Sequence, residues 1–514
     1  MGMLALRRLM AAQRDRRRRR KAQARNGAIA SMAKRKGTFL QGDDTSQGGK
    51  RLRYSGPYLT EDIWRHIHSL VPLRDAARAA CISQAFLRSW RRYPNLILTA
   101  DALGLELRKN WKVHMQRYFD RVDHILKNHS GIGVKRFQLQ CGRRKLICHL
   151  NNWLQIAISS GIEEITLSLP PEYSFPCSLL SGRSLQHLEL VSCAFRPVAG
   201  LGCSRNLTKL HLHSVLITDD ELACFLSESF ALKHLDLSYC REIVYLKIPC
   251  SLEQLSYLDV SSCRLQMIES KAPNLSSLSY SGNLVELSLG QSSQRINTPM
   301  VDAKFLHLNY LEIYFDGLDG DDEAFPQEYD YLSLVSVLDA SPVLDTFILS
   351  VQQGGMKHDS VSSDTTTNLR TMPGHKHERL KEVMIIGFCS ATSMIELTCH
   401  ILENTTSLET ITLDIVCDVD DLEDVGRCCT TTLCKTGSCY PLRREMILEA
   451  NREVMAIKRY IRGKVPSNVE LAVHKPCTWC HDLERLDALE KKNGSHHSPP
   501  HFKLENISLL LKRV

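Results

Sequence analysis

One leucine pattern returns along the middle of the chain, with the spacing L-x-x-L-x-L-x-x-C. Its four regular copies begin at Leu185, Leu207, Leu232 and Leu255, so successive copies start 22, 25 and 23 residues apart. Apolar and polar residues alternate within each copy, which predicts a short β-strand with its leucines on one face. Weaker copies lie at residues 134–139, 162–167, 275–280, 308–313, 344–349, 380–385 and 408–413.

This near-constant step predicts a solenoid, because steps of 20–29 residues are typical of leucine-rich repeats. We expect an α/β fold over residues 97–415, with a curved parallel sheet on the concave side and helices or loops on the convex side. One further copy, at Leu284, Leu287 and Leu289, begins only nine residues after its predecessor. That step is too short for a coil, so we expect one of the two, this copy or the one at residues 275–280, to be a bulged or hairpin strand.

Residues between the inward leucines should point out of the concave face, where neighbouring strands lie ~4.8 Å apart. Polar groups on three successive strands should then fall within ~10–15 Å of one another. We predict that this surface binds a protein target, because tyrosine is favoured at binding hot spots. A solvated sheet face without a partner is the alternative. The predicted target-binding residues are His187, Glu189, His211, His234, Asp236, Tyr257 and Asp259. The two outward columns read Glu189, His211, Asp236, Asp259, Ser279, Ser288 and His187, Lys209, His234, Tyr257, Ser277, Glu286.

Residues 58–96 predict a small helical module. Thr60 is a suitable N-cap for a first helix, whose apolar stripe is formed by Ile63, Ile67 and Leu70. Pro72 should end this helix, and Asp75 is the predicted N-cap of a second, alanine-rich helix. Two or three short helices bury their own apolar faces poorly, so the module should dock on a partner or on the next domain.

The module resembles an F-box over the stretch LTEDIWRHIHSLVPLRDAARAACISQAFLRSW. Thr60 stands where that family usually has proline, and Phe86 where tryptophan is commoner. The resemblance implies docking on a Skp-type adaptor and, through it, on the cullin of a ubiquitin ligase. An unrelated three-helix cap on the solenoid is the alternative. The adaptor-binding residues implied by the resemblance are Leu59, Ile63, Ile67, Leu70, Pro72, Leu73, Ile82 and Phe86.

The C-terminal part predicts a cap for the solenoid. Apolar residues recur at helical spacing from Leu442 to Ile461, before Gly463 and Pro466, and residues 469–473 alternate like a last strand. The order of these elements resembles the C-terminal part of plant F-box/leucine-rich-repeat proteins with an FBD-like end. The resemblance covers residues 58–480. We assign residues 416–480 to the cap and 481–514 to a C-terminal extension.

Charge divides the chain into a basic tail and a mildly acidic body. The formal net charge of the 514 residues is +8, yet residues 1–53 hold 16 Lys/Arg and three acids. We expect residues 1–57 to be disordered, because like charges repel and little apolar surface is available. The cluster Arg16, Arg17, Arg18, Arg19, Arg20 and Lys21 predicts a nuclear-import signal. The predicted location is therefore the nucleus, with the cytoplasm as a second location. The alternatives for the basic tail are a solvated extension without a function and an organelle presequence.

The 19 cysteines are scattered, which indicates free thiols in a reducing compartment. Three of them, Cys193, Cys240 and Cys263, occupy the turn position of the repeat. The late cysteines, from Cys428 to Cys439 and in Cys477-x-x-Cys480, do not form the two matched pairs that a zinc site normally needs. We expect residues 352–378 to form an exposed loop. No apolar run is long enough for a membrane span.

No nucleophile, phosphate-loop or metalloprotease motif is found, so we expect no catalytic residues, no cofactor and no metal site. The order of modules predicts a non-catalytic substrate-recognition subunit of an SCF-type ubiquitin ligase that binds an unknown protein target. Two alternatives remain. One is a nuclear nucleic-acid-associated protein acting through the basic tail, and the other is a receptor for a small ligand.

Overall fold

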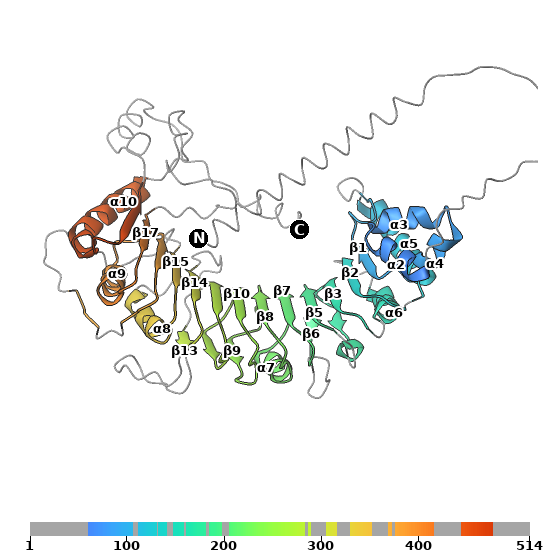
Figure 1. Ribbon diagram of the computed structural model, residues 1–514, viewed down its shortest axis with the longest axis horizontal. Coiled ribbons are helices and arrows are strands. Elements are labelled where there is room, and N and C mark those ends of the chain that lie inside the picture. Colours follow the sequence, from blue (N-terminus) through green and yellow to red (C-terminus); the bar gives the residue numbers. More distant parts are fainter. Residues whose placement is uncertain are drawn as a thin grey trace, which may run out of the picture. The chain divides into compact units, whose positions relative to one another are not determined.

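Thirteen parallel strands in one sheet form the body of the protein (Figure 1). The computed structural model describes residues 60–105, 111–130, 132–140, 147–158, 161–180, 185–197, 205–282, 286–288, 305–315, 329–351, 369–372, 376–415 and 444–475. Each strand pairs with the next in chain order, which confirms the predicted repeat solenoid. The strands are β1 (Asn95–Leu98), β2 (Arg136–Gln140), β3 (Glu164–Ser168), β5 (His187–Val191), β7 (Lys209–His213), β8 (His234–Ser238), β10 (Tyr257–Cys263), β12 (Ser277–Gly282), β14 (Tyr310–Phe315), β15 (Thr346–Val351), β16 (Glu382–Ile386), β17 (Thr410–Asp414) and β18 (Glu470–His474).

The inward leucines form continuous rows through the core. Leu188, Leu210, Leu235 and Leu258 are register partners on β5, β7, β8 and β10, and each is at most 1% exposed. Burying a leucine side chain contributes about 1.5–3 kcal/mol. Because each row continues into the next coil, the core is shared between neighbouring coils.

The turns that end the four regular strands share one backbone conformation. Ser192, Ser214, Tyr239 and Ser262 all have left-handed φ values, between 51° and 59°. This conformation lets the backbone N–H of Ser214 donate to Ser238 O in the next coil at 2.7 Å. The following cysteine or valine then turns inward. As predicted, Cys193, Cys240 and Cys263 are buried in these turns.

A second row of elements covers the other side of the coils. It contains β4 (Ser174–Phe175), β6 (Ala194–Phe195), α7 (Asp219–Ser227), β9 (Tyr245–Ile248), β11 (Met267–Ser270) and β13 (Glu286–Ser288). In Figure 1, α7 and β9 lie below the main-sheet strands β7, β8 and β10. A capping box begins α7, in which Thr218 and Glu221 satisfy each other's backbone N–H.

The prediction of a bulged or hairpin strand at residues 284–289 is wrong. β13 pairs in parallel with β11 in a separate three-stranded sheet, because the chain needs only nine residues to cross from one side of a coil to the other. Glu286 and Ser288 therefore do not continue the outward columns of the main sheet. Tyr310 and Glu312 of β14 take those places, opposite Ser277 and Ser279.

The N-terminal module consists of α2 (Glu61–Ser69), α3 (Leu73–Ala80) and α4 (Gln84–Trp90). Thr60 is the N-cap residue of α2, as predicted. The N-cap of α3 is Pro72, not Asp75, because the backbone N–H groups of Asp75 and Ala76 already donate to Pro72 O. Asp75 lies instead in the first turn, where its charge suits the helix dipole.

Two hydrogen bonds fix this module to the first strand of the sheet. Tyr93 donates its hydroxyl to Val71 O at 2.7 Å, and Asn95 donates its side-chain amide to Ser69 O at 3.1 Å. Ala76 also joins the continuous core. The helices α5 (Trp111–Asn128) and α6 (Ile147–Ala157) then lead from β1 to β2 and from β2 to β3 (Figure 1).

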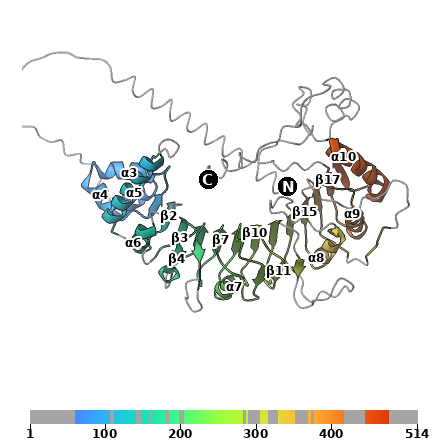
Figure 2. The same cartoon turned by 180° about the vertical axis from the view of Figure 1, so that it is seen from behind.

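The C-terminal end has the predicted helix followed by a strand. It contains η3 (Tyr331–Leu334), α8 (Val335–Asp339), α9 (Thr392–Asn404), α10 (Arg444–Ala456), a π-helical turn η5 (Ile457–Ile461), η6 (Arg462–Lys464) and then β18. Figure 2 shows α9 and α10 beside the end of the sheet where β17 lies. Within the described part of the chain, none of the helices combines the length and the apolarity that crossing a membrane requires.

Candidate functional site

Large apolar side chains are exposed on the N-terminal helices. Ile63 of α2 is 45% exposed, Leu70 at the end of α2 is 73% exposed, and Ile82 between α3 and α4 is 85% exposed. Pro72 is also exposed. Three large aliphatic side chains are thus left in water on a module of three short helices. We call Ile63, Leu70 and Ile82 the apolar face.

Two residues predicted for adaptor binding lie elsewhere. Leu73 is 5% exposed and packs in the core, so its predicted place on a docking surface is wrong. Phe86 is half-buried inside the module, against Trp64 at 4.9 Å and stacked on His68 at 4.6 Å between ring centroids. Ile67 is half-buried as well, and Leu59 lies outside the described residues.

The outward columns of the main sheet have the predicted register from β5 to β12. His211 of β7 stands opposite Glu189 on one side and Asp236 on the other, and Asp259 of β10 follows Asp236. His187, Lys209, His234 and Tyr257 form the neighbouring column. The local alternation of strand residues is sufficient to specify these columns.

Hydrogen bonds and an ion pair connect the outward polar groups. Nδ1 of His211 lies 3.3 Å from Oδ2 of Asp236, whose Oδ1 accepts from the Ser238 hydroxyl at 3.0 Å. The Tyr257 hydroxyl donates to Oδ2 of Asp259 at 3.0 Å. These residues are half-buried, so the side chains hold one another in place while part of each remains accessible. We call His211, Asp236, Tyr257 and Asp259 the outward polar cluster.

The two carboxylates of this cluster have opposite pKa shifts. Burial by itself raises the pKa of Asp236, but hydrogen bonds from His211 and Ser238 outweigh burial and leave the pKa below its usual value. Burial raises the pKa of Asp259, and the negative charges of Asp236 and Glu312 add to this effect although the Tyr257 hydroxyl opposes it. The cluster therefore holds one firmly ionised carboxylate beside one that takes up a proton more readily.

The imidazoles beside the cluster are kept neutral. Burial, followed by the charge of His211, lowers the pKa of His187, and burial with Lys209 lowers that of His234. The ring of His187 lies 5.2 Å from that of His211, and the ring of His234 lies 5.7 Å from that of Tyr257. These tilted aromatic contacts add apolar contact area to an otherwise polar face.

Sequence reasoning missed three members of this face, namely Tyr310, Glu312 and Thr166. Tyr310 donates its hydroxyl to Oε2 of Glu312 at 2.6 Å on β14, which repeats the Tyr257–Asp259 arrangement two strands away. The shared signal is a tyrosine followed two residues later by an acid, in outward positions of a strand. The irregular repeat at residues 284–289 concealed it. The Thr166 hydroxyl, on β3, donates to Glu189.

Other predicted sites lie outside the described residues. These are the basic cluster Arg16–Lys21, the cysteine run with Cys477 and Cys480, and most of the 352–378 loop. Where that loop is described, the prediction of exposure is wrong for His377, which is 2% exposed. Within the described part of the chain, one group of side chains has the spacing of metal ligands, namely Asp339, His377 and His400. No sequence motif indicated this group.

Comparison with known proteins identifies the family. Residues 125–295 and 292–478 match the model of the family described as At1g61320/AtMIF1, LRR domain. Among curated proteins of Arabidopsis thaliana, the F-box protein At5g03100 is 23% identical over 196 residues, which cover 38% of this chain and 59% of that protein. The F-box/LRR-repeat protein At3g58940 is 27% identical over 279 residues, which cover 52% of this chain and 41% of that protein.

The FBD-associated F-box protein At5g56370, also from Arabidopsis thaliana, is 24% identical over 242 residues, which cover 45% of this chain and 55% of that protein. Each of these three relatives is thus matched over less than two thirds of its length. The family model, by contrast, matches well over half of this chain. The chain therefore belongs to the At1g61320/AtMIF1 leucine-rich-repeat domain family and is a plant F-box/leucine-rich-repeat protein.

Proposed function

We propose that this protein is the substrate-recognition subunit of an SCF-type ubiquitin ligase. The helices α2–α4 dock on a Skp-type adaptor and through it on a cullin, and the outward face of the sheet binds a protein target for ubiquitination. The observation that carries the proposal is the apolar face, Ile63, Leu70 and Ile82, on a module that resembles an F-box.

The attachment of the module to the solenoid supports this proposal. The hydrogen bonds from Tyr93 and Asn95 and the buried side chains of Leu73 and Ala76 join α2–α4 to the first coil. A rigid connection holds a bound target at a fixed position relative to the adaptor. Positioning raises the effective concentration of the target's lysines at the ubiquitin-carrying enzyme, so the chain itself needs no catalytic residue.

The target-binding role is assigned to the outward polar cluster. A pre-ordered tyrosine loses little conformational entropy on binding and offers both a ring and a hydroxyl. The ionised Asp236 favours a target with a basic or hydrogen-bond-donating patch. We further propose that the cluster Arg16–Lys21 directs the protein to the nucleus.

The adaptor step is tested with one surface substitution and a matched control. Ile82→Asp places a charge in the middle of an apolar contact and should abolish capture of a Skp-type adaptor from plant extract, because an unpaired charge is costly to bury. Ile132→Asp is the control, since Ile132 is 64% exposed but lies outside α2–α4. It should capture adaptor like the wild type. Equal capture by both variants, or no capture by the wild type beside a known F-box protein, would reject the proposal.

A further inference from the structure

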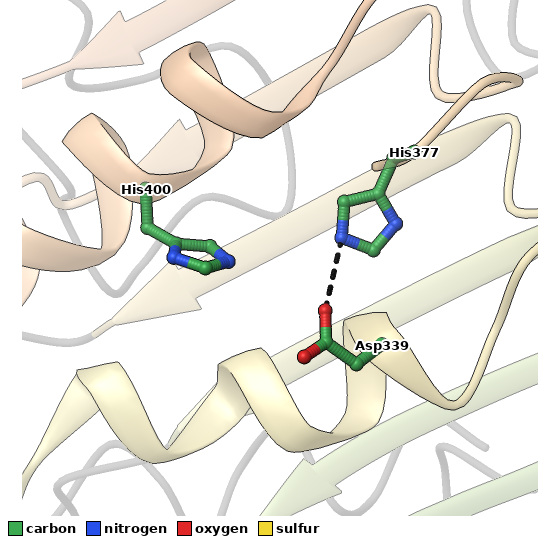
Figure 3. Close-up of side chains that lie close together, drawn as sticks. All are labelled: Asp339, His377 and His400. Atoms are coloured by element: carbon green, nitrogen blue, oxygen red, sulfur yellow. Dashed lines mark ion pairs between the residues drawn. The ribbon is translucent and has the colours of Figure 1, made fainter. Parts of the chain in front are cut away.

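Three metal-ligating side chains from successive coils meet beside the late strands. Asp339 is the last residue of α8, before β15; His377 precedes β16; and His400 lies on α9, between β16 and β17. One ligand atom of each lies within 4.8 Å of the other two. Figure 3 shows the two imidazoles and the carboxylate directed toward a common point, with Nε2 of His377 3.4 Å from Oδ1 of Asp339.

Both histidines are buried with unsatisfied nitrogens. His377 is 2% exposed and His400 is 4% exposed. Neither ring nitrogen of His377 has a hydrogen-bond partner, although Nε2 is within ion-pair distance of Asp339, and Nε2 of His400 has none. Buried polar atoms are nearly always satisfied in native proteins, so Nε2 of His377 and Nε2 of His400 call for a ligand between them. Nδ1 of His377 lies on the far side of its ring and takes no part in this argument (Figure 3).

Backbone contacts fix the positions of the two histidines relative to each other. The N–H of His377 donates to Asn404 O at 2.8 Å, and the N–H of Thr406 donates to His377 O at 3.2 Å. Asn404 is the last residue of α9, and its side-chain amide lies 3.3 Å from Nδ1 of His400. The same amide nitrogen donates to His400 O at 2.9 Å, so Asn404 fixes the end of α9 that carries His400.

The donor atoms and the separation of His377 from Asp339 suit a tetrahedral divalent ion. Metal–ligand distances of about 2.0–2.2 Å place tetrahedral donors about 3.3 Å apart, and the His377–Asp339 separation of 3.4 Å is close to that value. Two imidazoles and one carboxylate suit Zn²⁺ better than Ca²⁺ or Mg²⁺, which prefer oxygen ligands. Three protein ligands leave a fourth position for water.

We propose that Asp339, His377 and His400 bind a divalent transition-metal ion, with Zn²⁺ as the preferred ion. The ion would join three successive coils that are otherwise held only by contacts between neighbours. It lies in a part of the solenoid away from the outward polar cluster in sequence, so the proposal does not depend on the proposed ligase function.

Cobalt and zinc titrations of the full chain test the site. The apoprotein is titrated with Co²⁺ and with Zn²⁺, comparing wild type with His400→Gln and Asp339→Asn. His474→Gln is the matched control, because His474 also lies near a carboxylate, Asp414 at 3.5 Å, but is not part of the group of three. Visible Co²⁺ bands without a thiolate charge-transfer band identify nitrogen and oxygen ligation and separate this site from cysteine sites.

We expect the wild type and His474→Gln to bind one more Co²⁺ per chain than His400→Gln. Asp339→Asn, which preserves shape, should bind at least about tenfold more weakly, since even outer partners of a metal site change affinity by 10–100-fold. Zn²⁺ should raise the melting temperature of the wild type and of His474→Gln but not that of His400→Gln. Identical Co²⁺ spectra and stoichiometry in the wild type and both site variants would overturn the proposal and leave the group as a His–Asp ion pair only.

Discussion

His211 and Asp236 lie side by side on adjacent strands, with Nδ1 of the imidazole 3.3 Å from Oδ2 of the carboxylate. The two residues occupy the same position in successive repeats, so the pairing follows from the register of β7 and β8. The Ser238 hydroxyl holds the other carboxylate oxygen. This pair is the ordered centre of the surface to which target binding is assigned.

Removing the phenol and carboxylate beside this pair should weaken target capture. Tyr257→Ala combined with Asp259→Ala deletes a half-buried ring and its hydrogen-bonded partner, and we expect fewer proteins from plant extract to be retained at equal adaptor occupancy. Quantitative mass spectrometry of the retained proteins provides the measurement. Tyr245→Ala is the control, because Tyr245 is 45% exposed on β9 of the other sheet. An unchanged set of retained proteins would make this face a solvated surface.

Acidification should destabilise the protein through His187 and His234. Their folded-state pKa values are lowered from 6.5, mainly by burial. The neutral rings therefore contribute stability that is present above 6.5 and is lost as the pH falls through the lowered folded-state values. Melting temperatures of wild type and of His187→Gln with His234→Gln, compared between about pH 7.5 and about pH 5.5, check this.

The double variant should lose less stability over that interval than the wild type. His66→Gln serves as the control, because His66 is exposed on α2 and should leave the pH dependence unchanged. If the double variant and the wild type lose the same amount, these two imidazoles do not contribute to the pH dependence.

Substitutions at two neighbouring leucines should affect different properties, one the stability of the fold and the other the binding of the adaptor. Leu73→Ala removes a buried side chain and should cost about 2–5 kcal/mol in the free energy of unfolding, whereas Leu70→Ala, at 73% exposure, should change it by less than about 0.5 kcal/mol. Denaturant unfolding gives the free energies, and adaptor pull-down gives the binding. Loss of adaptor binding with normal stability is expected for Leu70→Ala alone. The reverse result would place Leu73, not Leu70, on the docking surface.

A buried carboxylate makes the late repeats sensitive to loss of Arg370. Glu396 is 2% exposed and accepts from the backbone N–H of Arg370 at 2.7 Å and from its guanidinium at 2.6 Å. Arg370→Ala leaves this charge without its cation, at a cost of roughly 1–3 kcal/mol after allowing for the half-exposed guanidinium. Denaturant unfolding measures the change.

Lys381→Ala is the matched control for Arg370. Lys381 and Asp345 form an ion pair at 3.1 Å in which both side chains are about half exposed, so its loss should cost less than about 1 kcal/mol. Equal effects of the two substitutions would show that Glu396 does not need the guanidinium.

The sequence by itself determined the repeated strands and the outward columns from β5 to β12. Alternation of side chains is a local property of an extended chain, and a constant step between repeats keeps neighbouring strands in register. The proximity of His211, Asp236, Tyr257 and Asp259 followed from these two properties alone. The helix and the last strand of the C-terminal cap were predictable for the same local reason.

Only the tertiary structure decided features that depend on how the coils pack. β13 has the local pattern of an inner strand, but the short connection before it places it in the second sheet. Leu73 follows the apolar pattern of its exposed neighbours, yet it packs in the continuous core and is 5% exposed. Asp339 and His377 lie 38 positions apart along the chain, and His377 and His400 lie 23 positions apart. Their meeting depends on the stacking of three coils of unequal length, which no periodicity along the chain specifies.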